Sequence, residues 1–456
     1  MERCSGWGPG RSRYFGRFFP LSRIPKITYI GAGSSTFAAR LISDFVVTPG
    51  LDAGTMALVD IDPERLELSR QISEKVIRLS GRDWTVTTTT DREEALPGSD
   101  YVINSIEVGG LACVEPDYEI PLKYGVDQCI GDTIGPGGIF KALRTGPAWL
   151  DIVADVQRLA PGAVVMNYTN PMSILTLAAD RTTDLSIVGL CHSVQGTSRL
   201  LAEFLQVPYQ ELEWRCAGIN HNAWFTTLAK DGEDLYPRLR ERARVPSVYE
   251  QDPVRFEMML HFGAFVTESS GHFSEYVPYF RKRKDLIEKF MRAGYHGESG
   301  FYARNWPTWR LLNAEVVRGL LSGSLDIDLS RSHEYASYIV EAIEHDRPFE
   351  IHGNVTNDGW IENLPRGCVE VPCLVDGRGI QPEKFGALPE QLAGLNRAHM
   401  TVHELMVQAL IERDREKARM ALMLDPLTAA VCSLDEISAM FDEMWEAERP
   451  HLSAFE

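Results

Sequence analysis

No stretch of this chain reaches the roughly 18 consecutive apolar residues of a membrane-spanning helix, so no transmembrane segment is predicted. Cysteine is also sparse, with eight among 456 residues. The cysteines form neither a C-x-x-C pair nor a dense disulfide framework. Free thiols in a reducing compartment, the cytoplasm, are therefore expected. Acidic residues outnumber basic ones, and the net charge of −18 repels nucleic acid phosphate and anionic lipid, so neither nucleic acid nor a membrane is an expected partner.

The chain also lacks internal repeats, low-complexity tracts and a clear flexible linker. A chain of 456 residues is too long to fold around one compact core. We therefore expect two fused subdomains packed together, residues 24–210 and 211–456. Residues 1–23 differ from the rest, because arginines stand among glycines and aromatics without the apolar core of a secretion signal. We predict a disordered extension there, with a transit peptide or a start codon placed too far upstream as alternatives.

Short β-rich runs alternate with amphipathic segments in the first subdomain. The predicted strands are 26–30, 56–60, 84–89, 101–105, 164–168 and 187–190, and the predicted helices include 37–46, 63–79 and 139–159. This alternation predicts an α/β fold with a doubly wound parallel sheet of the Rossmann type, like that of lactate and malate dehydrogenases. The second subdomain is predicted to be α+β and mostly helical, with strands within 216–228 and at 368–375 and helices within 249–345 and 388–445.

The motif Gly31-x-Gly33-x-x-Thr36 follows the first strand and opens a helix. Gly31 permits the tight turn, Gly33 permits close approach of a phosphate, and bare amides at a helix N-terminus attract a pyrophosphate. Thr36 replaces the usual third glycine, and an ordinary βα turn is the alternative. Asp60 ends the second strand, where a carboxylate binds the ribose 2′-hydroxyl of NAD, with Asp62 as its competitor. The other residues of the predicted NAD site are Ser34, Ser35 and Asn104.

Three later strands end in polar residues that suit a metal or a substrate. They carry Asn170 in an Asn-Pro pair, Cys191 in the run Cys-His-Ser, and His221 in a tight turn. A thiolate, an imidazole and an amide that converge on one crevice suit a divalent transition metal. Taken singly, Cys191 is a small core residue, His221 a turn histidine and Asn170 part of a turn, so the prediction depends on their shared placement.

Two further segments hold groups suited to proton transfer or substrate binding. The Gly-rich run 131–138 carries Asp132, and we favour a mobile substrate loop over a second phosphate cradle, because one dinucleotide needs only one cradle. The segment 267–279 is rich in acids and phenols, which are good general bases beside a metal, although a serine-capped helix start is the alternative. The segment holds two acids, Glu268 and Glu275, the histidine His272, and two phenols, Tyr276 and Tyr279.

These motifs together resemble glycoside hydrolase family 4, and within it the melibiase-type α-galactosidases. The resemblance covers nearly all of residues 26–445 and is carried by the blocks KITYIGAGSSTF, LVDIDPERLE, GDTIGPGGIFKALRT, NYTNPM, GLCHSVQGT, AGINHNAW, TESSGHFSEYVPYF, GNVTNDG, NLPRGCVEVPCLVD and GIQPEKFGALP. The family implies a redox-elimination reaction in place of two flanking carboxylates. NAD oxidises C3 of the sugar, a divalent metal such as Mn²⁺ stabilises the enediolate, a base removes the C2 proton, the aglycone leaves, water adds and the hydride returns.

By position, the resemblance assigns five residues. Cys191 and His221 match the two protein ligands of the metal. Asn170 matches the substrate-binding asparagine, and Asp132 matches the acid of the Gly-rich loop, which faces sugar hydroxyls. His192 stands where some relatives place the acid that protonates the leaving group, a task for which a histidine is suited.

The base and the sugar are less sharply assigned. Relatives place the base in the region matching 267–279, where Glu268 and Tyr276 are the candidates, with Tyr279 behind them. Ser193, in Cys-His-Ser-Val, is the family's marker for α-galactosidases and belongs to the predicted substrate site. No phosphate-binding signature is evident, because a solvated basic turn explains Arg281 and Arg283 better than an anion site, so unphosphorylated substrates are favoured.

Three alternatives to an α-galactosidase remain open at this stage. The first is an α-glucosidase or an α-glucuronidase or galacturonidase with the same machinery. The second is an NAD-dependent 2-hydroxy acid dehydrogenase, which shares the sheet but has no use for a paired cysteine and histidine. The third is a non-catalytic NAD or sugar sensor. Relatives are dimers or tetramers, so a homodimer or homotetramer is expected, with long C-terminal helices available as an interface.

Overall fold

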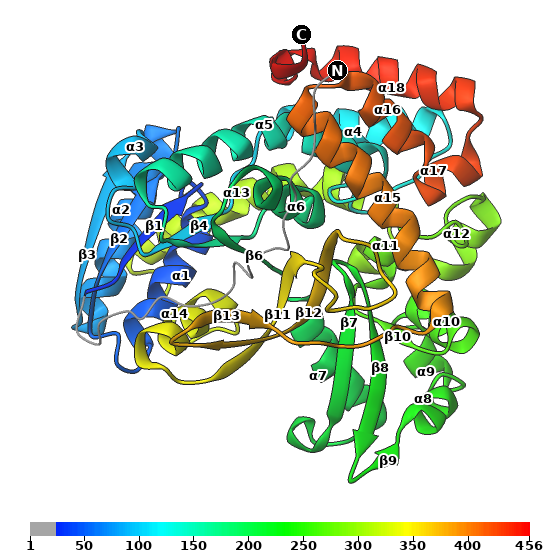
Figure 1. Ribbon diagram of the computed structural model, residues 1–456, viewed down its shortest axis with the longest axis horizontal. Helices are drawn as coiled ribbons and strands as arrows, with labels where there is room; N and C mark the ends of the chain where they lie inside the picture. The colour runs from blue at the N-terminus through cyan, green and yellow to red at the C-terminus, as the bar shows by residue number, and fades with distance from the viewer. Residues whose placement is uncertain (1–23) are drawn as a thin grey trace, which may run out of the picture.

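The computed structural model describes residues 24–456, which fold around one 13-stranded sheet (Figure 1). The strand order is β10-β8-β7-β12-β11-β6-β5-β4-β1-β2-β3, with β13 paired to β12 and β9 to β8. Helices cover both faces of this sheet (Figure 1). The predicted extension 1–23 lies outside the described residues.

The first half of the chain forms the doubly wound parallel sheet that the sequence predicts. Its strands run in the order β3-β2-β1-β4-β5-β6, and each neighbouring pair is parallel. The strands are β1 (Lys26–Ile30), β2 (Ala53–Val59), β3 (Asp83–Thr89), β4 (Tyr101–Asn104), β5 (Val164–Asn167) and β6 (Ser186–Leu190). The helices are α1 (Ser35–Val47), α2 (Pro63–Ser80), α3 (Arg92–Ala95), α4 (Leu111–Lys123), α5 (Gly135–Leu159), α6 (Met172–Thr182) and α7 (Ser193–Leu205).

Local sequence signals explain where these elements begin and end. Asp62 caps α2, because its carboxylate accepts hydrogen bonds from the amides of Glu64 and Arg65, and Pro63 starts the helix. Gly81 ends α2 in the left-handed conformation at φ +67°. The strands β4 and β5 are buried along their whole length, as expected when helices cover both faces of a parallel sheet.

The second half extends the same sheet beyond β6 with antiparallel strands. The predicted strands of 216–228 are β7 (Glu213–Ile219) and β8 (Asn222–Lys230), and the predicted strand 368–375 is β12 (Cys368–Asp376). An unpredicted strand, β11 (Phe349–Thr356), joins the halves, because it pairs with β6 on one side and with β12 on the other. The short strands are β9 (Glu233–Asp234), β10 (Phe265–Val266) and β13 (Gly379–Pro382).

The remainder of the second half is mostly helical, as predicted. Its helices are α8 (Tyr236–Arg242), α9 (Pro246–Tyr249), α10 (Pro253–Phe262), α11 (Ser270–Phe273), α12 (Lys284–Phe290), α13 (Phe301–Ser322), α14 (Tyr335–His345), α15 (Glu390–Glu412), α16 (Arg415–Met423), α17 (Pro426–Val431) and α18 (Leu434–Glu448). The C-terminal helices α15, α16 and α18 pack against α5. A large apolar core that includes Phe140, Phe441 and Trp445 fills this contact.

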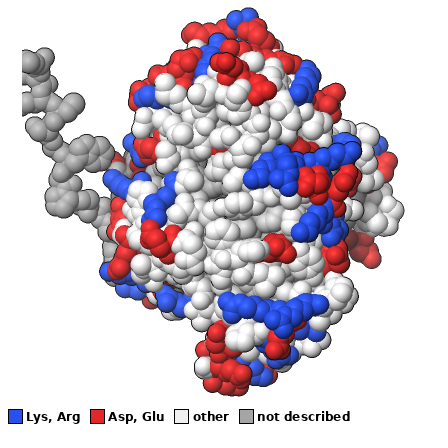
Figure 2. Space-filling view, turned by 90° about the vertical axis from the view of Figure 1, so that its right-hand side faces the viewer, with Lys and Arg blue, Asp and Glu red and all other residues white. Residues whose placement is uncertain are grey.

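The cysteines, the helices and one face of the surface can be compared with the expectations from composition. Each cysteine of residues 24–456 carries a free thiol. Within that range no helix is both long enough and apolar enough to cross a bilayer. On the face shown in Figure 2, the lysines and arginines form separate groups beside acidic residues, around a broad area of uncharged residues. That face therefore lacks the continuous positive stripe that tracks a phosphate backbone.

Candidate active site

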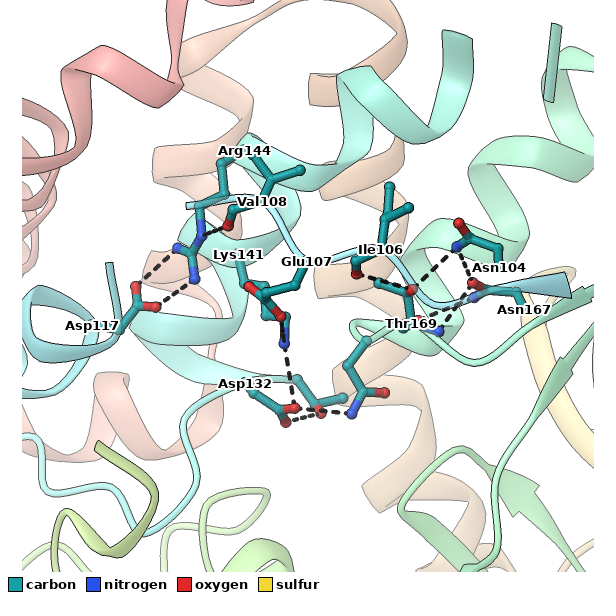
Figure 3. A network of polar contacts seen from close by, with 12 residues as sticks. Asn104, Ile106, Glu107, Val108, Asp117, Asp132, Lys141, Arg144, Asn167 and Thr169 are labelled. Carbon is teal, nitrogen blue, oxygen red and sulfur yellow. Dashed lines mark hydrogen bonds and ion pairs between the residues drawn. The ribbon is translucent and has the colours of Figure 1, made fainter. Parts of the chain in front are cut away.

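The carboxyl ends of the parallel strands meet at one edge of the sheet, where such folds bind their ligands. Asn104 at the end of β4 lies in register with Asn167 at the end of β5. Nδ2 of Asn104 donates to Oδ1 of Asn167 at 2.8 Å and to the Thr169 hydroxyl at 3.1 Å (Figure 3). This buried amide network fixes two strand ends beside the Gly-rich turn.

The turn after β1 has the geometry that its glycines predict. Gly31 adopts φ +91°, and a Cβ there would lie 2.7 Å from the carbonyl of Ser105. The amide of Gly33 donates to Oδ2 of Asp60 at 2.6 Å, while Oδ1 of Asp60 accepts from the amide of Asp62 at 2.9 Å. Asp60 thus faces the turn, whereas the carboxylate of Asp62 caps α2.

The N-terminus of α1 has no side-chain cap. Ser34 is the N-cap residue of α1, and its side chain makes no capping hydrogen bond. The Ser35 hydroxyl accepts a hydrogen bond from Ser69 of α2 at 2.9 Å, so that side chain faces α2, while Thr36 is half-buried in the first turn. The first amides of a helix have no partner within the helix, so the uncapped N-terminus of this 13-residue helix suits an anion.

Cys191, His221 and Glu268 form a compact group of metal-ligand type. One ligand atom from each lies within 4.8 Å of the other two, and Nε2 of His221 is 3.5 Å from Oε2 of Glu268. Cys191 follows β6, and His221 occupies the turn between β7 and β8 at φ +62°. Burial alone would raise the pKa of Glu268, but the charges of His221 and His272 outweigh burial and hold it below its ordinary value.

Buried polar atoms without hydrogen-bond partners surround this group, among the described residues. Such atoms are Nδ1 of His221, Nε2 of His272 and the phenol oxygen of Tyr276. Both carboxyl oxygens of Glu370 on β12 also lack a partner, and burial raises the pKa of that carboxyl well above its ordinary value. Buried polar groups are normally satisfied, so these atoms fit a site completed by a metal and polar ligands.

Asp132 lies at the centre of a second polar network (Figure 3). Its carboxylate accepts hydrogen bonds from Asn170 at 3.0 Å and from Thr133 at 2.6 Å. Lys141 of α5 is 3.6 Å away and His272 3.5 Å away. Burial alone would raise the pKa of Asp132, but Lys141, His272 and these two hydrogen bonds outweigh burial and hold it below its ordinary range. Asp132 is thus an anion fixed in position beside Asn170.

The first part of the Gly-rich run, residues 131–134, packs closely against the first turn of α5, which holds the rest of the run. A Cβ at Gly137 would lie 2.2 Å from the carbonyl oxygen of Gly131, so glycine there permits close packing of loop and helix. Glu275 accepts hydrogen bonds from the amides of Cys129 at 2.6 Å, Ile130 at 2.7 Å and Gly131 at 3.0 Å. The loop expected to be mobile is therefore held by a buried carboxylate just before Asp132.

The run Cys-His-Ser opens α7 beside the metal-ligand group. The Cys191 thiol donates to the Ser193 hydroxyl at 3.4 Å. The His192 side chain is 64% exposed, and its Nδ1 lies 3.2 Å from Oε1 of Glu334. This contact raises the pKa of His192 to about 9, which keeps its imidazole protonated at neutral pH.

The structure places two of the three base candidates beside the metal-ligand group. The Tyr276 ring centroid lies 6.4 Å from that of His221 and 6.1 Å from that of His272. Burial raises the pKa of Tyr276 well above its ordinary value. Tyr279, in contrast, is 40% exposed and packs against Phe262.

The interpretation of Arg281 as part of a solvated basic turn is wrong. Its guanidinium is buried, forms an ion pair with Asp127 and donates to the Ser274 hydroxyl at 2.6 Å. Arg283 is exposed and pairs with Asp285 at 2.9 Å. A buried charge is tolerated only when it is paired and hydrogen-bonded, and Arg281 meets both conditions. Arg281 is therefore part of the folded core and not of a solvated turn.

Sequence reasoning missed Lys141, Glu107 and Glu370. Lys141 stands in the otherwise apolar run 139–143, and Glu370 stands among apolar residues of β12. A lone charge in an apolar run signals a buried charged group, and this signal was available for both, although only Lys141 has an ion-pair partner. Glu107 carries no such signal, because its loop gives no indication of which cation it meets.

Two family models match the chain. The Family 4 glycosyl hydrolase model matches residues 26–207, and the Family 4 glycosyl hydrolase C-terminal domain model matches residues 216–428. Among curated relatives, the α-galactosidase of Bacillus subtilis (strain 168) is 41% identical, over 93% of this chain and 98% of the relative. The α-galactosidase of Rhizobium meliloti (strain 1021) is 37% identical, over 94% and 89%.

Relatives with other sugar specificities also match. The α-glucosidase of Erwinia rhapontici is 31% identical, over 94% of this chain and 99% of the relative. An α-galacturonidase and a 6-phospho-β-glucosidase of Bacillus subtilis are 30% and 28% identical.

Solved structures agree with the fold. A Bacillus subtilis protein described as a glucosidase superposes with a TM-score of 0.82 at 27% identity, over 92% of this chain and 99% of that one. The Thermotoga maritima 6-phospho-β-glucosidase with manganese, NAD⁺ and glucose-6-phosphate gives 0.76 at 24%, over 93% and 99%. A Cryptosporidium parvum malate dehydrogenase gives 0.53 at 15%, over 86% and 100%, which confirms the dehydrogenase-like sheet. The chain is a glycosidase and belongs to glycosyl hydrolase family 4.

Proposed function

We propose that this protein hydrolyses α-galactosides with the help of NAD and a divalent metal. The observation that carries the proposal is the compact group Cys191, His221 and Glu268 beside the Asp132 network, at the sheet edge that also holds the Gly-rich turn. Relatives named α-galactosidase at 41% and 37% identity support this choice of sugar. Structures of relatives with NAD and manganese support the choice of cofactors.

The residues of the Gly-rich turn fit NAD. Amides at the start of α1, from Ser34, Ser35 and Thr36, would hold its pyrophosphate, and Asp60 would accept a hydrogen bond from the ribose. Cys191 and His221 would bind the metal, since thiolates and neutral imidazoles are ligands of divalent transition metals, and the choice of Mn²⁺ is supported by relatives whose structures contain manganese. When bound, NAD supplies a hydride acceptor for C3 of the sugar and the metal supplies a Lewis acid at its hydroxyls.

The chain's own side chains would orient the sugar and move protons. Asp132 and Asn170 would fix sugar hydroxyls, since they already share a hydrogen bond of 3.0 Å and lie in a fixed network. Tyr276 or Glu268 would take the C2 proton, because both lie beside the metal ligands. His192, with its pKa raised to about 9, would donate a proton to the departing oxygen.

The test is hydrolysis of 4-nitrophenyl α-galactoside by protein stripped of cofactor and metal. NAD, Mn²⁺ and a thiol reductant are added back singly and together. Activity only with the full set, without net NADH formation at 340 nm, supports the proposal. Activity without NAD would refute the mechanism, and release from the matching α-glucoside alone would make this an α-glucosidase.

Asp60→Ala is expected to weaken NAD binding by about 1.5–3 kcal/mol, the contribution of a charge-assisted hydrogen bond. Asp60 faces the turn through the amide of Gly33, whereas Asp62 is engaged as a helix cap. Titration calorimetry with NAD measures the loss, and Asp62→Ala is the matched control, which lowers stability through its lost cap. Equal NAD affinity in wild type and Asp60→Ala would count against the assignment.

The proposal extends to the setting of the enzyme. Free thiols, including the Cys191 ligand, need a reducing compartment, which favours the cytoplasm. Exposed Leu311 and Leu312 on α13 favour a homodimer or homotetramer. Light scattering on the purified protein would measure the oligomeric state.

A further inference from the structure

A buried lysine lies between two carboxylates next to the proposed sugar site. Nζ of Lys141 is 2.9 Å from Oε2 of Glu107 and 3.6 Å from Oδ2 of Asp132 (Figure 3). Burial alone would lower the pKa of Lys141, but the two carboxylates outweigh burial and raise it, so the ammonium stays charged. One ammonium thus faces two carboxylates, and the group carries a net negative charge.

The second cation of this region is also neutralised. Arg144 donates to both carboxylate oxygens of Asp117, at 3.1 and 2.6 Å, and to Glu448 at 2.8 Å. Lys141 and Arg144 both line a small cleft that also touches Asp132. The two cations of the cleft therefore have no charge to spare for an anionic ligand, although an unpaired Lys or Arg would attract one.

Glu107 gives the group of Lys141, Asp132 and Glu107 its net negative charge, and it lies near solvent. Its side chain is 28% exposed, against 7% for Lys141 and 13% for Asp132. A carboxylate or phosphate on a sugar held by Asp132 would meet two like charges in a partly desolvated space. Hydroxyl groups would instead find acceptors that are already fixed in place.

We propose that Glu107, by engaging Lys141, restricts this active site to uncharged sugars and rejects uronic acids and sugar phosphates. This inference rests on the proposed function and gives its substrate a chemical class. It also bears on a difference among the relatives, since α-galacturonidases and a 6-phospho-β-glucosidase are named for anionic sugars. Repulsion between like charges is a common way for a site to reject the wrong ligand.

The experiment compares wild type and Glu107→Gln with NAD and Mn²⁺ present. The substrates are the 4-nitrophenyl α-glycosides of galactose, galacturonic acid and galactose 6-phosphate. The ratio of kcat/KM for each anionic substrate to that for the galactoside is expected to rise at least tenfold in Glu107→Gln. Glu115→Gln, which removes an exposed charge from α4, is the matched control and should leave the ratio as in wild type. Glu107→Ser repeats the test with a second side chain.

A binding measurement separates the inference from the proposed function. Calorimetry on the same proteins gives the dissociation constants of galactose and galacturonate. Wild type is expected to prefer galactose, and Glu107→Gln to lose at least part of that preference. Equal ratios in all variants, equal binding of both sugars by wild type, or binding of neither sugar would overturn the inference. A neutral-sugar preference without hydrolysis of any glycoside would overturn the proposed function alone.

Discussion

Replacing Cys191 with alanine is expected to abolish hydrolysis, with kcat lower by on the order of 1000-fold, while NAD remains bound. The thiolate is the one sulfur ligand in the group with His221 and Glu268, whose ligand atoms lie within 4.8 Å of one another. A bound divalent metal contributes several kcal/mol to stabilising the charge that develops on the sugar oxygens, and about 4 kcal/mol corresponds to three decades of rate.

The measurement combines nitrophenol release with direct titration of Mn²⁺ and NAD. Manganese binding followed by electron paramagnetic resonance should weaken strongly, and NAD affinity should stay within about twofold, because the cofactor turn lies on different strands. Cys216→Ala is the matched control, since this thiol is buried in the core of β7. Full activity in Cys191→Ala would remove the metal assignment, and loss of NAD with the metal would show that the two sites cannot be separated.

The parallel half of the fold could be predicted because its signals are local. Each of the strands β1 to β6 is a short β-rich segment. Gly31 and Gly33 mark the turn between β1 and α1, where the first crossover begins. The start of α5 was predicted at 139 but lies at Gly135. Glycines usually predict a loop, and here the packing of Gly131 and Thr133 against Gly137 and Gly138 overrides that tendency.

The strand β11 was not predicted, because polar residues interrupt its apolar pattern and one of its partners, β6, is distant in sequence. Its buried residues include His352 and Asn354, which disguise an interior strand in the sequence. It pairs on one side with β12, the next strand in sequence, and on the other side with β6, which lies more than one hundred residues earlier in the chain. Only the assembled sheet reveals that the two halves of the chain share it.

In the candidate site, too, some residues could be predicted from local sequence and others depend on contacts between remote segments. The placement of Cys191 and His221 at strand ends follows from the rule that parallel strands present their carboxyl ends together. The pairs Glu107 with Lys141 and Arg281 with Asp127 join segments that are remote in sequence, so no periodicity or motif could have linked them. Arg281 shows the consequence, because its charge alone predicted a solvated turn, and its burial depends on a partner found only in three dimensions.

Asp132→Asn is expected to lower kcat/KM for 4-nitrophenyl α-galactoside by about 100-fold, while the fold is retained. An asparagine keeps the shape but loses the charge, and a charge-assisted hydrogen bond to a sugar hydroxyl contributes about 1.5–3 kcal/mol. Stability should fall by only about 1–2 kcal/mol, because Lys141 retains Glu107 as its partner at 2.9 Å. Asp151→Asn, an exposed change on α5, is the matched control and should alter neither quantity.

The two readouts separate a role in the reaction from a role in the fold. Denaturant unfolding reports stability, and initial rates over a range of substrate concentrations report kcat and KM. Because Asp132 is fixed by Asn170, Thr133 and Lys141 before any sugar arrives, its contribution should be present in both ground and transition states. A rise in KM should therefore account for most of the loss in kcat/KM, and kcat should change little. A variant that unfolds readily yet keeps its rate per folded molecule would show that Asp132 serves only to anchor Lys141.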